Sequence, residues 1–299
     1  MALRVRILGA DSFGSRSMAT VVEANGVKIV VDPGVSYAPR RYGLPPHRLE
    51  LARLSEIRDR IVRELEDAEY VVITHYHYDH YLREPEYAEL FKDKIIFVKH
   101  PSRSINLSQR IRAYRFLRKN RVEDLAARVE YADSRRFQLD DGVELIFSPP
   151  VPHGAPGTKL GYVVMAAIRC CGETFVHASD VQGPMSSDAA NWILELRPGL
   201  IFISGPPTYF AGYKVPREEV ERGLQGLRML AEKLVNATII ADHHFARDLA
   251  YPEYLAELNA IGGARLVSAA EYMGIRYEPL EALRKRLWEE HREEAPNSD

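Results

Sequence analysis

The sequence predicts an α+β fold in which two β-sheets pack face to face and helices cover them. Two observations indicate this fold: strand-like segments fall into two blocks of the chain, and helical segments follow each block. The 299 residues contain no internal repeat, no low-complexity segment and no linker-like stretch. We therefore expect a single domain over residues 1–299.

The first block begins with a strand at residues 3–10 and continues with a hairpin at 18–34. Asn25-Gly26 is a strong signal for the tight turn of that hairpin. Residues 48–69 carry apolar side chains at helical spacing, which predicts an amphipathic helix. The short apolar run at residues 70–74 then predicts a buried strand.

The second block begins after a helix-rich stretch of the chain. We expect helical insertions at about 35–69 and 101–130 in the domain. The remaining predicted elements are helices at 83–93, 105–129, 216–235 and 251–260, a charged helix near the carboxyl end, and strands at 94–100, within 136–154, at 160–169, 173–180, 198–204 and 236–245, and near 264–269.

The composition excludes several classes of protein. Hydrophobic residues make up 46% and charged residues 27% of the chain, and the formal net charge is −2, as in ordinary globular proteins. We find no apolar run long enough for a membrane span and no signal peptide, so we expect a cytoplasmic protein without a membrane partner.

The two cysteines, Cys170 and Cys171, are adjacent, and we interpret them as reduced thiols at a hairpin turn.

A cluster of histidines follows the strand at residues 70–74. His75 and His77 are two positions apart, so extended backbone would point both imidazoles to one side, where they could hold one metal ion. Asp79 and His80 come on the turn beyond and are free to serve a second ion. This spacing indicates a metal site rather than a polar turn.

Further candidate ligands also stand at strand ends, where functional loops gather. These residues are His153, Asp180, His243 and His244. A strand places alternate residues on opposite faces, so His243 and His244 cannot both face one ion from a strand.

The set resembles the metallo-β-lactamase superfamily of binuclear metallohydrolases. The resemblance rests on residues 74–80, His153-Gly154 with Gly161-Tyr162, Ser179-Asp180, a late histidine, and the early hairpin that ends in Asp32-Pro33-Gly34. It implies a four-layer αββα sandwich with two mixed sheets. The stretch from His244 to Arg247 is similar to a motif of ribonuclease Z-like members, with Ala246 in place of a serine. The ribonuclease Z arm and the β-CASP insertion are both missing, which suggests a separate branch nearest to phosphodiesterase-like members.

The resemblance also implies roles for the candidate residues. His75, His77 and His153 would hold one ion, and Asp79, His80 and a late histidine the other. Asp180 would bridge the two ions. We expect the late ligand to be His244, with His243 as a proton donor, and the reverse assignment stays open. Asp32 would orient a ligand histidine.

We therefore expect a metal-dependent hydrolase that uses a metal-bridging hydroxide oriented by Asp79. The expected cofactor is a pair of divalent ions, zinc first, with Mn²⁺ or Fe²⁺ as alternatives. A phosphodiester or other anionic ester is the expected substrate class. The alternatives are a hydrolase of thioesters, lactones or amides, and a non-catalytic metal- or nucleic-acid-binding protein on the same fold.

Candidate substrate contacts come from basic and aromatic loops. Arg40, Arg41 and Tyr209 would border the cleft. Between residues 103 and 121 the chain carries many arginines and no acidic residue. The simpler interpretation of that run is a solvated helix face, and the alternative is a track for nucleic acid. A homo-oligomer is compatible with the sequence.

Overall fold

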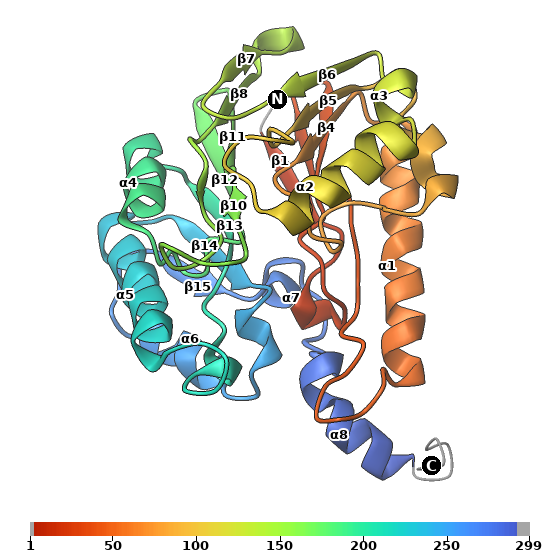
Figure 1. Cartoon of the computed structure of the whole chain (residues 1–299). Coiled ribbons are helices and arrows are strands. Elements are labelled where there is room, and N and C mark those ends of the chain that lie inside the picture. Colours follow the sequence, from red (N-terminus) through yellow and green to blue (C-terminus); the bar gives the residue numbers. More distant parts are fainter. Residues whose placement is uncertain (1–2, 292–299) are drawn as a thin grey trace.

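Two mixed β-sheets lie face to face at the centre of the molecule, and helices cover their outer faces (Figure 1). The computed structural model describes residues 3–291 of the chain. The predicted α+β sandwich, with two mixed sheets flanked by helices, is confirmed.

The first sheet has six strands in the order of the chain. They are β1 (Arg4–Ile7), β2 (Thr20–Ala24), β3 (Val27–Val31), β4 (Tyr70–Ile73), β5 (Ile95–Val98) and β6 (Arg128–Tyr131). The pairs β1/β2 and β2/β3 are antiparallel, whereas β3 to β6 run parallel. Asn25 and Gly26, both at positive φ (50° and 94°), make the predicted tight turn between β2 and β3.

The second sheet has seven strands in the order β15-β14-β13-β12-β11-β8-β7. They are β7 (Arg136–Gln138), β8 (Glu144–Phe147), β11 (Ala166–Cys170), β12 (Glu173–Ser179), β13 (Leu200–Ser204), β14 (Thr238–Asp242) and β15 (Arg265–Val267). The four strands from β12 to β15 are parallel neighbours. A separate two-stranded ladder joins β9 (Val151–Pro152) to β10 (Tyr162–Val163).

Helices of the two blocks cover opposite faces of the sandwich, as Figure 1 shows. On the side of the first sheet lie α1 (Arg48–Glu66), α2 (Leu107–Tyr114) and α3 (Val122–Leu125). On the side of the second sheet lie α4 (Ser187–Leu196), α5 (Arg217–Lys233) and α6 (Tyr251–Asn259). The short α7 (Ala269–Tyr272) and the final α8 (Leu280–Glu290) complete the described chain. No helix in residues 3–291 combines the length and the hydropathy that a bilayer crossing requires.

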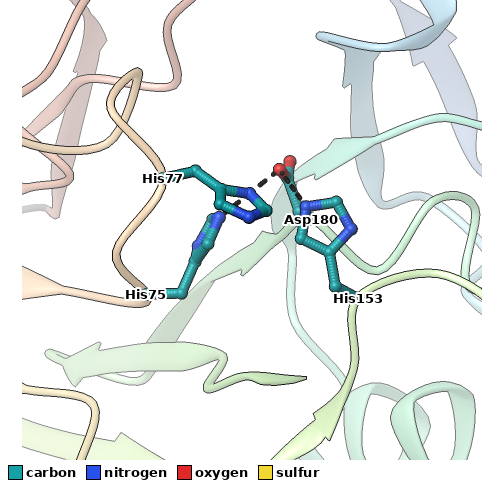
Figure 2. Close-up of side chains that lie close together, drawn as sticks. All are labelled: His75, His77, His153 and Asp180. Atoms are coloured by element: carbon teal, nitrogen blue, oxygen red, sulfur yellow. Dashed lines mark ion pairs between the residues drawn. The ribbon is translucent and has the colours of Figure 1, made fainter. Parts of the chain in front are cut away.

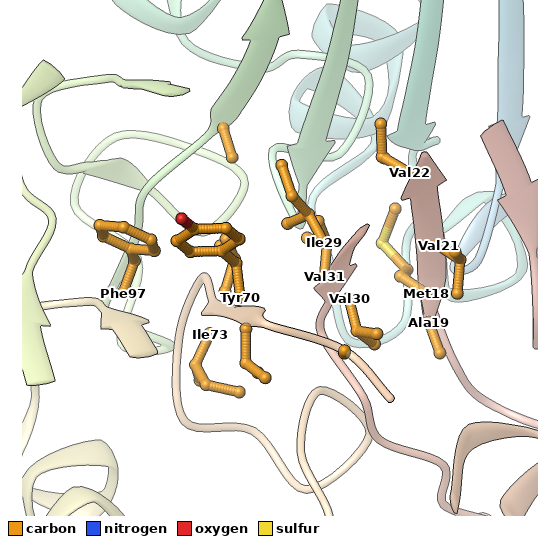
Figure 3. Packing of buried hydrophobic residues seen from close by; sticks show 14 of the residues in the cluster. Met18, Ala19, Val21, Val22, Ile29, Val30, Val31, Tyr70, Ile73 and Phe97 are labelled. Carbon is orange, nitrogen blue, oxygen red and sulfur yellow. The ribbon is translucent and has the colours of Figure 1, made fainter. Parts of the chain in front are cut away.

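The main hydrophobic core fills the space between the sheets. Tyr70 and Phe97, whose ring centroids are 6.3 Å apart, stand side by side within it (Figure 3). Successive side chains of a strand point to opposite faces of the sheet, so they pack in different layers of the sandwich. In β13, Phe202 joins the inter-sheet core, whereas Ile201 and Ile203 pack with residues of α4 to α6.

Two helix predictions are wrong in detail. The predicted helix at 105–129 is broken at Arg121, which adopts a left-handed conformation (φ 59°). The short helix α3 follows, and the edge strand β6 begins at Arg128. The predicted helix at 83–93 is only a 3₁₀ segment, Pro85–Phe91.

Candidate metal centre

Loops from both sheets bring the predicted ligand residues to one end of the sandwich. In the first sheet, His75 and His77 follow the parallel strand β4. In the second sheet, Asp180 follows β12 and His243 follows β14. The carboxyl ends of parallel strands form the usual binding edge of such a sheet, and here two such edges face each other.

The first group consists of His75, His77, His153 and Asp180, whose donor atoms all lie within 4.8 Å of one another. Nε2 of His153 is 2.9 Å and Nε2 of His75 is 3.6 Å from Oδ2 of Asp180. Figure 2 shows the side chains converging on one small space from both sides. Three imidazoles and one carboxylate at this spacing can hold a single transition-metal ion.

The second group consists of Asp79, His80 and His243, again within 4.8 Å. Nε2 of His243 lies 3.5 Å from Oδ2 of Asp79 and 3.4 Å from Oδ1 of Asp180. Nε2 of His80 lies 3.4 Å from Oδ2 of Asp180. Asp180 therefore faces both groups.

Several buried donor atoms at the centre have no hydrogen-bond partner in the described part of the protein, and a cation would supply one. Buried atoms that have no hydrogen-bond partner include Nε2 of His75, His80 and His153, and Oδ1 of Asp180. A buried polar atom without a partner is costly, and a metal ion would satisfy each of these. The cluster is thus able to bind metal.

Asp32 forms hydrogen bonds with residues of the loop that follows β4. Its Oδ2 accepts a hydrogen bond from Nδ1 of His80 at 2.7 Å. The same carboxylate accepts from the backbone N–H and the hydroxyl of Thr74 at 2.7 and 2.6 Å. With Nδ1 of His80 carrying the proton, its Nε2 keeps a free lone pair for a metal.

His243 and His244 differ in the partner of Nδ1. Nδ1 of His243 lies 2.8 Å from Oδ2 of Asp11 and carries a proton, so Nε2 is the nitrogen that would bind a metal ion once its own proton is displaced. Nδ1 of His244 lies 2.9 Å from a guanidinium nitrogen of Arg247, which can only donate. Nδ1 of His244 must therefore accept, and in the neutral ring the proton sits on Nε2, 3.5 Å from Asp180.

Mutual charge and burial set the protonation of the centre. Burial raises the pKa of Asp180, but the neighbouring histidines, His243 first among them, hold it well below its usual range. Burial lowers the pKa of His243, yet Asp180 and Asp11 raise it to about 9. Burial, together with Arg247, lowers the pKa of His244 to about 3. The carboxylates are therefore ionised and attract positive charge, whereas His244 is neutral.

The sequence reasoning missed Asp11 and gave no role to Arg247. Asp11 lies in the 3₁₀ turn Asp11–Phe13 after β1, and it holds the buried Arg247 through Oδ1 at 2.7 Å. Both are almost fully buried. The position of Asp11 beyond a strand end is the same signal that identified the candidate ligands.

The predicted substrate residues Arg40, Arg41 and Tyr209 all line one cavity of about 990 Å³, which we call the Tyr209 cavity. Cζ of Arg41 lies 4.2 Å from the ring centroid of Tyr209. His153 and His244 also line this cavity, so it opens onto the metal cluster.

A second cavity, of about 620 Å³, is lined by Tyr78 and Arg112 together with His77, Asp79 and Asp180. We call it the Tyr78 cavity. Arg112 is the only member of the basic run at 103–121 that borders either of these two cavities in the described part of the chain. Arg118 and Arg121 instead pair with Glu123 and Asp124.

Comparison with known proteins places this geometry in a family. Residues 14–166 match the model of the metallo-beta-lactamase superfamily. The UPF0282 protein of Aeropyrum pernix is 50% identical over 292 residues, which cover 96% of this chain and 98% of that protein. The UPF0282 protein of Thermococcus gammatolerans is 42% identical over 303 residues, covering 98% and 97%.

Solved structures share the fold at low sequence identity. Zn²⁺-bound PqqB from Methylobacterium extorquens has a TM-score of 0.53 at 12% identity, with 88% of this chain and 97% of that chain covered. Tm1679, a metal-dependent hydrolase of the beta-lactamase superfamily, has a TM-score of 0.52 at 14% identity, with 90% and 97% covered. The predicted resemblance and the predicted enzyme family are confirmed. The chain belongs to the metallo-β-lactamase superfamily and, within it, to the UPF0282 proteins.

Proposed function

We propose that this protein is a binuclear metal-dependent hydrolase of phosphodiesters or similar anionic esters. The observation that carries the proposal is the position of Asp180 between two groups of donor atoms. Its Oδ2 faces His75 and His153 of the first group and also His80 of the second, and its Oδ1 faces His243 of the second group. A single structural ion would need only one closed set of ligands.

The two ions would divide the donor atoms between them. His75, His77 and His153 would hold one ion, Asp79, His80 and His243 the other, with Asp180 shared. This exchanges the expected roles of His243 and His244, for the reason given by their Nδ1 partners. A set of imidazoles and carboxylates without thiolate suits Zn²⁺, and Mn²⁺ and Fe²⁺ are the alternatives.

When bound, the two ions would supply hydroxide at neutral pH and withdraw charge from the substrate. Asp79, with a side chain only 16% exposed, can accept a hydrogen bond from the attacking water and orient it. Neutral His244 presents Nε2–H toward the centre and can donate a hydrogen bond to a substrate oxygen that gains negative charge.

The cavities support an anionic substrate. Arg40, Arg41 and Lys214 line the Tyr209 cavity and have no carboxylate within 4.0 Å among residues 3–291. Unpaired cations at a site attract anions and cost little when they bind one. A neutral lactone or amide would leave these charges unused.

Metal analysis combined with turnover of bis(p-nitrophenyl) phosphate tests the proposal. We expect two ions per chain, and turnover that Asp180→Asn abolishes. Asp188→Asn, an exposed change at the start of α4, serves as the control. One ion per chain, or turnover that survives Asp180→Asn, would refute the binuclear mechanism. Thioester and lactone substrates, measured in parallel, would reveal activity on a different ester class.

A further inference from the structure

The Tyr78 cavity has a basic wall that the sequence did not reveal. Two guanidiniums lie against the ring of Tyr78, with Cζ of Arg83 at 4.4 Å and Cζ of Arg112 at 4.3 Å from its centroid. Arg58 of α1 lines the same cavity. Arg58 and Arg112 have no carboxylate within 4.0 Å in the described chain, so they are available to an anion.

The Tyr209 cavity has the same chemistry on the other side of the centre. Cζ of Arg41 lies 4.7 Å from the ring of Tyr42 and 4.2 Å from the ring of Tyr209. Nζ of Lys214 lies 4.8 Å from the ring of Phe210. Both cavities thus combine unpaired cations with aromatic rings.

The two cavities meet at the metal cluster. His153 and His244 line both of them, and so do Pro39 and Leu160, which come from two different loops. A chain of phosphates lying across the cluster would therefore find a basic wall before the centre and another after it.

Cations paired with aromatic rings along a groove are the means by which proteins bind single-stranded nucleic acid, because cations bind phosphates and rings stack on bases. Exposed tyrosines add stacking surface at both cavities: Tyr37 is 41% exposed in the Tyr78 cavity, and Tyr213 is 80% exposed in the Tyr209 cavity. Volumes of about 620 and 990 Å³ have the size of ligand pockets, which suits single nucleotides rather than a duplex.

Resting on the proposed function, we propose that the substrate is a single-stranded nucleic acid that occupies both cavities and is cut at an internal phosphodiester. Water oxygen bonds to phosphorus, the bond from phosphorus to one sugar oxygen breaks, and that oxygen takes up the proton that the water loses. The Tyr78 cavity holds the strand on one side of the cut, and the Tyr209 cavity holds it on the other.

A circular single strand tests this directly, because it has no end and can be cut only if the strand leaves the centre on both sides. The metal-loaded full chain is incubated with circular RNA and circular DNA of one sequence, and with bis(p-nitrophenyl) phosphate. We expect conversion of at least one circle to the linear form. If the small diester is hydrolysed and both circles stay intact, this inference fails while the proposed function stands. If none of the three is hydrolysed, both proposals fail.

Two variants test the two cavities separately. Arg112→Ala in the Tyr78 cavity and Lys214→Ala in the Tyr209 cavity each remove one cation. A plot of log(kcat/KM) against log salt concentration has a negative slope for a single strand. Each variant should make that slope less steep by about 0.7, the effect of one lost phosphate contact. Arg110→Ala on the same helix as Arg112, and Lys233→Ala on α5, are the matched controls, because both side chains are exposed and line neither cavity. An unchanged slope in either cavity variant would refute occupation of that cavity.

Discussion

Oδ2 of Asp11 lies 2.8 Å from Nδ1 of His243, although 232 positions separate the two residues. Asp11 follows the first strand of one sheet, and His243 follows β14 of the other. The contact fixes the imidazole with Nε2 toward Asp79 and Asp180. A carboxylate behind a ligand histidine sets its tautomer and raises its basicity.

Asp11→Asn should therefore weaken metal binding at the group that contains His243. An amide accepts a weaker hydrogen bond from Nδ1, and we expect a loss of about 10- to 100-fold in affinity for one ion. Competition with a chelator, followed by metal analysis, measures it. Asp124→Asn, at an exposed carboxylate of α3, should leave metal content unchanged. Equal affinity in the Asp11 variant and the wild type would contradict the assignment.

His243→Ala and His244→Ala should separate binding from turnover. Without His243 the chain should hold one ion fewer, because a ligand is lost. Without His244 it should keep both ions, and kcat should fall by about 100-fold because a hydrogen-bond donor to the reacting oxygen is gone. Metal content and bis(p-nitrophenyl) phosphate kinetics are measured on the same samples. If His244→Ala loses the ion and His243→Ala keeps it, the two roles are reversed.

The free energy of unfolding should depend on pH through the carboxyl group of Glu64, on α1. Its carboxylate lies 2.7 Å from Arg6 and 2.7 Å from Lys28, and the hydrogen bond from Arg6 and the neighbouring charges lower its pKa to about 2. A depressed folded pKa stabilises the fold above the ordinary pKa of 4.5, and this stabilisation is lost as pH falls from there to about 2.

The test compares urea unfolding of Glu64→Gln and wild type across that pH range. At pH 7 the variant should be less stable by about 1–3 kcal/mol, a range that allows for solvent screening of a partly exposed pair. The difference should shrink as pH falls through the window. Glu66→Gln, an exposed change on the same helix, is the control. A difference that is constant with pH would rule out the ionic origin.

The buried pair Arg284–Glu50 should hold the loop that carries Arg40 and Arg41. Arg284 makes two 2.7 Å contacts to Glu50 and donates to the carbonyls of Ala38 and Leu44. Arg284→Met leaves a buried carboxylate unpaired, so we expect a loss of about 3–5 kcal/mol in unfolding free energy.

Adding Glu50→Gln to Arg284→Met should recover part of that loss, because it removes the unpaired charge. The exposed Arg286→Met on α8 is the matched control. Thermal unfolding measures stability, and KM for an anionic substrate reports the loop. A double variant no more stable than Arg284→Met would show that charge burial is not the cause.

The chain should unfold as one unit. The inter-sheet core contains residues of both sheets, such as Val31 and Phe202, without a break between them. We therefore propose a single domain and expect one calorimetric transition for the metal-free protein, with equal calorimetric and van't Hoff enthalpies. Two separate transitions would contradict this.

Local signals carried most of what could be predicted. His75, His77, Asp79 and His80 follow one strand directly, so their grouping is visible in ten residues of sequence. Asp180 and His243 could be nominated because they also end strands. Which histidine turns its free lone pair to the centre depends on Asp11, and no local pattern links Asp11 to residue 243.

Features that depend on long-range packing, such as the edge strand β6 and the Tyr78 cavity, could not be predicted from the sequence. The strand β6 has polar residues at most positions and lies at an edge, where it lacks the apolar run that identifies β4 or β5. The predicted helix therefore ran on past Leu125, where α3 ends, and overlapped the start of β6. The Tyr78 cavity likewise needs α1, α2 and the loop after β4 to meet, which no spacing in the sequence indicates.

The donor atoms come from both sheets, with His75 and His80 on one and Asp180 and His243 on the other. A cation bound among them would be coordinated by residues from both sheets and would link the two sheets at one end of the sandwich. Any ligand that binds only the folded chain adds stability by mass action, about 2.7 kcal/mol at a hundred times its dissociation constant. The concentration of free metal would thus set the free energy of unfolding of the chain, in addition to its catalytic activity.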